Sequence, residues 1–430
     1  MGSIEGKSVT VELENVCLIN QAFPSKNLSF EEDLPIDHDC ENFLQDVMKI
    51  KVFSSIKTVV LSTKINLLMP FGPLAILVDK LFDSHGCVFL LSILGIIPLA
   101  ERLGYTTEQL AFFTGPTVGG LIYATFGNAT ELIISIHALK GGLVRLVQQS
   151  LLGSILSNLL LVLGCAFLAG GLTCYKRQQE FNHANATVDF GLLLMAVMGL
   201  LFPAVLHATH TEMEEEKSEL ALSRFTSCIM LVAYASYIVF QVKIQQTFQV
   251  SNDQDKVLKE VTSKEEEAPE ISMWESMIWL SILTGGISIL SEYLVNTIEG
   301  ASKEFNLPMA FLSVIVLPII GNAAEHVGSI IFAIKDKLDI SLGVAVGSSI
   351  QISMFVIPFC VIAGWMVECP MDLNFQPFET TSLFMTVILV AFILHNGTSN
   401  YFKGIMLILC YLIISASFFV HVDPISIGKN

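Results

Sequence analysis

Two short motifs place a glutamate inside a long apolar segment. The first reads GNATE over residues 127–131, and the second reads GNAAE over residues 321–325. An acidic residue in the middle of a membrane-spanning helix costs about 2.5–3.5 kcal/mol on insertion scales, so a pair of them indicates a function. We therefore expect Glu131 and Glu325 to carry the chemistry of this chain.

Oxygen-bearing side chains gather around both glutamates. In each motif helix the Asn, the Glu and a later Ser (residues 128, 131, 135 and 322, 325, 329) fall on one face. The adjoining apolar segments add polar faces formed by Ser154, Ser157, Asn158, Ser348 and Gln351. Hard divalent cations prefer such ligands, and Ca²⁺ takes about 6–8 oxygens in flexible geometry. The residues predict an oxygen cage for a divalent cation.

The charges of this cage suggest a mechanism. Two carboxylates in one low-dielectric site repel each other while both are ionised and unoccupied. One divalent cation neutralises the pair, and two protons do the same. Competition for the same carboxylates would then couple cation movement to proton counter-movement. His326, which follows the second glutamate, is a candidate proton relay.

The elements that position these residues are membrane spans. The chain has 430 residues, of which 53% are hydrophobic and 15% charged, whereas soluble domains carry about 25% charged residues. Runs of about 20 apolar residues predict an all-α polytopic membrane protein with eleven transmembrane helices. The predicted spans are 67–84, 87–103, 111–139, 146–172, 188–207, 224–242, 277–296, 307–334, 341–366, 380–395 and 404–422.

Composition also excludes several classes of protein. The net charge of −17 argues against a nucleic-acid partner. The nine cysteines are scattered without disulfide or zinc-finger spacing. We expect no resident cofactor, and no hydrolase motif such as HExxH or Gly-x-Ser-x-Gly is present, so we expect a protein that is not an enzyme.

The two motifs belong to an internal repeat. The glycines that open them are 194 residues apart (321 − 127), and Gly153-Ser154 matches Gly347-Ser348 at the same offset. The offset crosses five predicted spans, so the second copy would enter the membrane from the opposite side. We therefore predict an inverted repeat of five plus five helices, with one extra N-terminal helix and the site at the repeat interface.

The distribution of Lys and Arg predicts the orientation. A cytosolic N-terminus puts 16 of the 23 basic residues on the cytosolic side, which places the C-terminus in the lumen. The predicted parts are a cytosolic tail (1–66), the first helix (67–84), repeat one (87–245), an acidic cytosolic linker (246–276), repeat two (277–422) and a lumenal end (423–430). In the linker, Glu265, Glu266, Glu267 and Glu270 are candidates for cation collection, although charge blocks are more often plain solvated loops.

The sequence resembles the cation/proton exchanger (CAX) family, in particular the plant and fungal vacuolar Ca²⁺/H⁺ antiporters. The similarity lies in GPTVGGLIYATFGNATELIISIHALK and SLLGSILSNLLLVLG, and in the block from VLPIIGNAAEH to VAVGSSIQISMFVIP; milder similarity extends over about residues 60–420. The resemblance implies a vacuolar membrane protein that moves cytosolic Ca²⁺, with Mn²⁺ as a further candidate ion, into the vacuole in exchange for H⁺.

Carried over by motif, the family implies that Glu131 and Glu325 exchange cation and proton. It implies cation ligands at Asn128, Asn322, Ser154, Ser348 and Gln351. It also implies an autoinhibitory N-terminal tail, which a regulatory protein could relieve. Family members commonly have Asn at the position of Tyr123, so the lining of the first half could differ here.

Two other transport functions stay open. A Na⁺-coupled Ca²⁺ exchanger of the same superfamily generally has a Pro before the acid, but positions 130 and 324 are Thr and Ala. A divalent cation channel is the second alternative, and opposed buried carboxylates in an inverted repeat favour alternating access over it.

Overall fold

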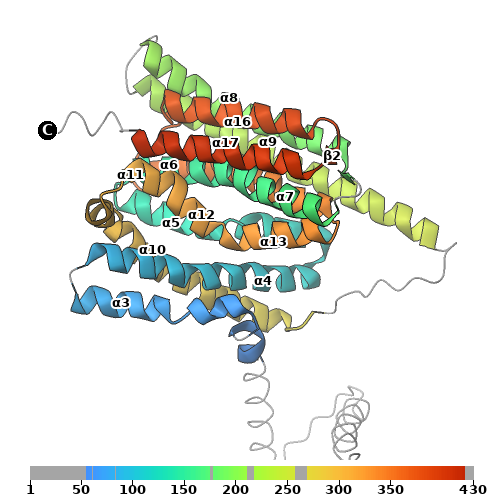
Figure 1. Cartoon of the computed structure of the whole chain (residues 1–430), viewed down its shortest axis with the longest axis horizontal. Helices are drawn as coiled ribbons and strands as arrows, with labels where there is room; N and C mark the ends of the chain where they lie inside the picture. Colours follow the sequence, from blue (N-terminus) through green and yellow to red (C-terminus); the bar gives the residue numbers. More distant parts are fainter. Residues whose placement is uncertain are drawn as a thin grey trace, which may run out of the picture. The chain divides into compact units, whose positions relative to one another are not determined.

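The described part of the chain is almost entirely helical. The computed structural model describes residues 55–60, 62–82, 84–174, 178–210, 217–256 and 269–421, and Figure 1 shows their long helices packed side by side. Among these residues, eight helices are long and apolar enough to cross a membrane, or nine if the bent pair Met309–Gly321 and Glu325–Ile334 is one span. An all-α polytopic membrane protein is thus confirmed, while the number of eleven spans stays a prediction.

The elements of the first half are η1 (Lys64–Leu68), α3 (Phe71–Leu81), α4 (His85–Phe126), α5 (Ala129–Lys140), α6 (Val144–Leu156), η2 (Ser157–Val162), α7 (Leu163–Thr173), β1 (Gln179–Glu180), α8 (His183–Thr209) and α9 (Lys217–Lys256). Those of the second half are α10 (Met273–Phe305), α11 (Met309–Phe311), η3 (Leu312–Val316), α12 (Leu317–Gly321), α13 (Ala323–Ile334), α14 (Leu338–Gln351), η4 (Ile352–Val356), α15 (Ile357–Met366), α16 (Pro377–Leu394), β2 (Thr398–Ser399) and α17 (Tyr401–Val420). The short strands β1 and β2 pair antiparallel.

Two predicted boundaries were wrong. The region 67–84 is divided at Met69-Pro70, and α3 has 11 residues, about 16 Å of helix against a hydrocarbon core of about 30 Å. The second candidate span covers His85–Thr114 instead of ending at residue 103. Helix α9 continues to Lys256, but the candidate span within it ends at Lys243, so the start of the linker at residue 246 stays a prediction.

Two local features explain where other helices begin and turn. A Cβ atom at Gly119 would lie 2.9 Å from the carbonyl oxygen of Ala111, although eight residues of straight helix span about 12 Å. The chain therefore reverses direction within α4. Helix α10 begins at Met273, before the predicted residue 277, because Ser272 and Glu275 form a reciprocal capping box there.

The helix boundaries follow the repeat found in the sequence. Helices α5 and α13 begin at residues 129 and 323, α6 and α14 at 144 and 338, and α7 and α15 at 163 and 357, each pair 194 residues apart (for example, 323 − 129). The π-helical turns η2 and η4 interrupt the same point of both copies, at residues 157–162 and 352–356. Such π-turns often accompany functional sites. The inverted orientation of the copies stays a prediction.

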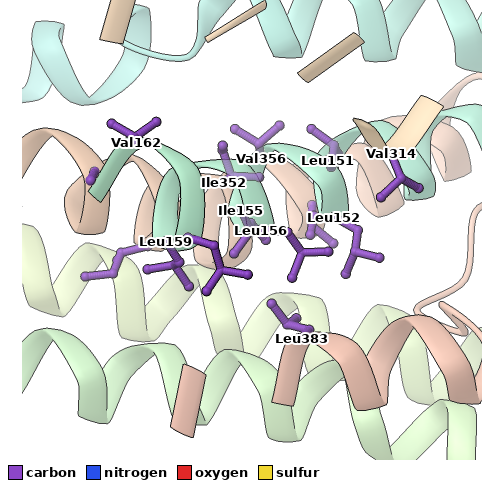
Figure 2. Close-up of a cluster of buried hydrophobic side chains, with 14 of the residues drawn as sticks. Leu151, Leu152, Ile155, Leu156, Leu159, Val162, Val314, Ile352, Val356 and Leu383 are labelled. Carbon is purple, nitrogen blue, oxygen red and sulfur yellow. The ribbon is translucent and has the colours of Figure 1, made fainter. Parts of the chain in front are cut away.

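The two copies interlock around a buried central helix. Apart from Arg145 in its first turn and its Ser, Asn and Gln residues, the segment α6–η2 is apolar on all sides, a pattern typical of a helix enclosed by others. Figure 2 shows this segment surrounded by Val314 of η3, Ile352 and Val356 of η4, and Leu383 of α16. Helix α13 packs against α7, and α5 packs against α15, so each motif helix is held by the opposite copy.

Equivalent glycines of the two copies have different surroundings. A Cβ atom at Gly153 would lie 2.1 Å from the carbonyl oxygen of Val314 and 2.7 Å from Cγ of Pro318, whereas one at Gly347 would meet no atom within 4 Å. The helices are therefore in close contact on the Gly153 side and separated on the Gly347 side.

We predict that Gly153→Ala destabilises the fold and that Gly347→Ala does not. The methyl group at Gly153 must displace backbone, and such overpacking costs about 1–3 kcal/mol. Thermal unfolding of the purified protein in detergent should give a lower midpoint for Gly153→Ala only. Equal midpoints for the two variants would contradict this account of the packing.

Candidate functional site

Both motifs lie at breaks between helices. Helix α4 ends at Phe126 and α5 begins at Ala129, while α12 ends at Gly321 and α13 begins at Ala323. The Asn of each motif lies at the junction, and Glu131 and Glu325 lie in the first turn of the helix that follows. In the second copy the two half-helices meet at 54°. The helix N-terminus favours negative charge, so each break reduces the cost of burying its carboxylate.

A continuous hydrogen-bond network joins the two breaks. The amide nitrogen Nδ2 of Asn128 donates to Oε1 of Gln351 at 2.5 Å. The hydroxyl of Ser348 lies 2.8 Å from Oδ1 of Asn128 and 3.2 Å from Oε1 of Glu325. The first motif is thus bonded directly to α14 of the other copy, and through Ser348 to the second glutamate.

Asn158 of η2 links Ser348 to the second motif. Its Nδ2 donates to Ser348 Oγ at 3.0 Å, and its Oδ1 accepts from Nδ2 of Asn322 at 3.1 Å. Asn322 also donates to the backbone carbonyl of Ser154 at 3.4 Å. The sequence places Asn158 on a polar face but not among the predicted cation ligands. The signal that could have identified it is the lone amide in the apolar run SNLLLVLG.

The remaining polar atoms of the site point to a cation. Oδ1 of Asn322 and Oε2 of Glu325 are buried acceptors without a hydrogen-bond donor among the described residues. Buried polar atoms are nearly always satisfied, so unmatched oxygens three residues apart on one helix face are suited to bind a positive ion. Within the part of the chain that the structure describes, no three His, Cys, Asp or Glu side chains form a metal-binding group. A cation bound here would therefore need amide and hydroxyl oxygens in addition to a carboxylate.

The two glutamates line different cavities. One cavity, of about 650 Å³, is lined by Glu325, Ser348 and Gln351 of the second copy and by Gly127 of the first. Glu131 and Ser154 line a space of only about 20 Å³, closed by Pro318 and Gly321. The carboxylates of Glu131 and Glu325 are nevertheless close enough to interact electrostatically. The Glu325 side of the site is therefore open to a large cavity, whereas the space on the Glu131 side holds no more than about one water molecule.

The other predicted residues have varied surroundings. Nδ1 of His326 is 2.7 Å from the carbonyl oxygen of Asn322, while its buried Nε2 has no partner among the described residues. Glu270 accepts a hydrogen bond from the hydroxyl of Tyr105 at 2.7 Å. Glu265, Glu266 and Glu267, the side chain of Tyr123, most of the N-terminal tail and the C-terminal end 423–430 lie outside the residues that the structure describes.

Comparison with known proteins identifies the family. The model of the sodium/calcium exchanger protein family matches residues 84–243 and 275–420. Vacuolar cation/proton exchanger 2 of Arabidopsis thaliana is 62% identical over 416 residues, which cover 96% of this chain and 94% of that protein. A solved structure of the Ca²⁺/H⁺ antiporter YfkE has a TM-score of 0.68 at 35% identity and covers 83% of this chain and 98% of that one.

A more distant solved structure, of the H⁺/Ca²⁺ exchanger CAX, shares the fold with a TM-score of 0.63 at 12% identity, over 85% of this chain and 94% of that one. The family match covers both copies of the repeat and both motif glutamates. The chain therefore belongs to the sodium/calcium exchanger protein family, among its cation/proton exchangers.

Proposed function

We propose that this protein is a vacuolar membrane antiporter that moves Ca²⁺ out of the cytosol in exchange for H⁺. The observation that carries the proposal is an amide and hydroxyl network that joins the two glutamate-bearing helix breaks and leaves oxygens of Asn322 and Glu325 unmatched. The names of the plant relatives and of the YfkE antiporter agree with this function. Ca²⁺ is preferred over softer ions because every candidate ligand is an oxygen; Mn²⁺ is a second candidate cargo.

The hydroxyl of Ser348 gives the competition between ions a physical basis. It has one proton and two acceptors within reach, Oδ1 of Asn128 and Oε1 of Glu325. When Glu325 is ionised, the hydroxyl donates to it and leaves the Asn128 oxygen available to Ca²⁺. When Glu325 is protonated, it donates to Ser348, whose own proton then occupies Asn128. A proton at the second glutamate would therefore withdraw two cation ligands at once.

The difference between the two cavities supports alternating access. The open cavity is lined by Gln241 and Val242, at the C-terminal end of the candidate span Ser218–Lys243, beyond which α9 continues toward the acidic linker. With the N-terminus in the cytosol, as the basic residues predict, this cavity faces the cytosol. The closed space beside Glu131 would open toward the lumen when the interlocked copies exchange their packing.

We predict that Glu131→Gln and Glu325→Gln each abolish Ca²⁺ uptake driven by a pH gradient. An amide cannot take up and release the exchanging proton, so a loss of at least about tenfold is expected. The measurement is Ca²⁺ uptake into acid-loaded proteoliposomes, and Glu299→Gln on the exposed face of α10 is the matched control.

Uptake that persists in either site variant would contradict the proposed site. Uptake driven by a Na⁺ gradient in place of the pH gradient would favour a Na⁺-coupled exchanger. Flux that needs no counter-ion would indicate a channel.

We predict that Ser348→Ala lowers the apparent affinity for Ca²⁺ by about three- to tenfold. Each lost hydrogen bond is worth about 0.5–1.5 kcal/mol, and the variant also removes the switch between Asn128 and Glu325. Ser349→Ala is the control, because the Ser349 hydroxyl bonds to the carbonyl of Ala345 in its own helix. Equal KM values for the two variants in the uptake assay would refute the role of Ser348.

A further inference from the structure

The open cavity holds two carboxylates that the exchange site does not use. Asp189 of α8 and Asp339 of α14 line it together with Glu325. Asp339 lies at the start of α14, twelve residues before Gln351, so the cavity follows this helix over about 18 Å. No Lys, Arg or His is found among the described residues that line it. The wall therefore presents only negative charge to an approaching ion.

Asp189 has an unusual environment for a carboxylate within a candidate span. It is half-buried, and its Oδ1 accepts a hydrogen bond from the hydroxyl of Tyr237 at 2.8 Å. Nε2 of Gln241 donates to the same hydroxyl at 2.8 Å, which fixes the position of the phenol. The structure records no ion pair for Asp189 among the described residues. Charged groups inside membrane segments usually pair with a charge or lie on an ion pathway.

A second observation indicates that the cavity is built for a cation. At its inner end, Oε2 of Glu325 is a buried acceptor without a hydrogen-bond donor among the described residues. A cavity of 650 Å³ accommodates on the order of twenty water molecules at about 30 Å³ each, so an ion can travel through it with its hydration shell.

We propose that Asp189, held by Tyr237, is a separate binding station for hydrated Ca²⁺ between the mouth of the cavity and the exchange site. Its role in transport rests on the antiport function proposed above, whereas its binding of the ion does not. An intermediate carboxylate raises the local concentration of the ion and divides one long approach into two short ones. Asp339 contributes general negative charge at the mouth, since its Oδ1 is engaged by the backbone N–H of Asn182.

A direct binding experiment tests the station without transport. Tb³⁺ replaces Ca²⁺ in oxygen sites and emits when a nearby tyrosine is excited, and Tyr237 contacts Asp189. The full chain with Glu131→Gln and Glu325→Gln should retain Tb³⁺ luminescence that Ca²⁺ displaces. Adding Asp189→Asn should weaken this binding by about tenfold, and adding Tyr237→Phe should reduce the emission.

The control for binding is Asp336→Asn, which removes one charge near Asp339 but outside the cavity lining. It should leave the Tb³⁺ titration of the Glu131→Gln and Glu325→Gln protein unchanged. If Asp189→Asn gives the same titration as this control, the station does not exist.

Transport provides an independent measurement. In the otherwise unchanged protein, Asp189→Asn should raise the KM for Ca²⁺ by about tenfold, keep the maximal rate within about twofold, and flatten the dependence of KM on ionic strength. Asp189→Glu should restore the KM. An unchanged KM with a lower maximal rate would mean that Asp189 only supports the fold. If the unsubstituted protein shows no uptake driven by a pH gradient, the antiport proposal fails, while the Tb³⁺ experiment still decides on the station.

Discussion

The constraint on which the rest of the structure depends is the burial of two like charges at paired helix breaks. Each glutamate is placed in the first turn of a half-helix, where the free backbone N–H groups and the helix dipole favour a negative group. Neither half can complete the site by itself, since Asn128 bonds to Gln351 and Asn322 bonds to Asn158 across the copies. The interlocking of α5 with α15 and of α13 with α7 holds these distant residues in register.

Sequence reasoning could predict the parts of the site that follow the repeat. The fixed offset identified Glu131 and Glu325 as equivalent, and the helix boundaries of three element pairs keep the same offset. Composition was sufficient for the class of fold, because apolar length and the scarcity of charge are direct consequences of the bilayer. The break in the first span was less visible, since Pro70 can either kink a helix or end it.

The parts that could not be predicted are those in which the two copies differ. At the repeat offset, Asn158 corresponds to Ile352 and Gln351 corresponds to Ser157, so the bonds of these residues have no symmetric counterpart. The contrast between the crowded Gly153 and the open Gly347 depends on which state the molecule occupies, and sequence alone carries no information about the state. The open cavity and its wall carboxylates arise from α8 and α9 of the first copy and α13 and α14 of the second, two parts that are distant in the chain.

The described wall of that cavity carries acidic side chains and no basic ones. This distribution of charge favours the free calcium ion over calcium that is bound in anionic complexes. Much of the calcium in a cell is complexed by organic acids and phosphates, and many such chelates carry net negative charge. A wall with Asp189, Asp339 and Glu325 repels these complexes while it attracts the free ion. The protein would then respond to the activity of uncomplexed calcium and not to the total amount, so that a change in the cell's organic acids alters its substrate supply without any change in calcium content.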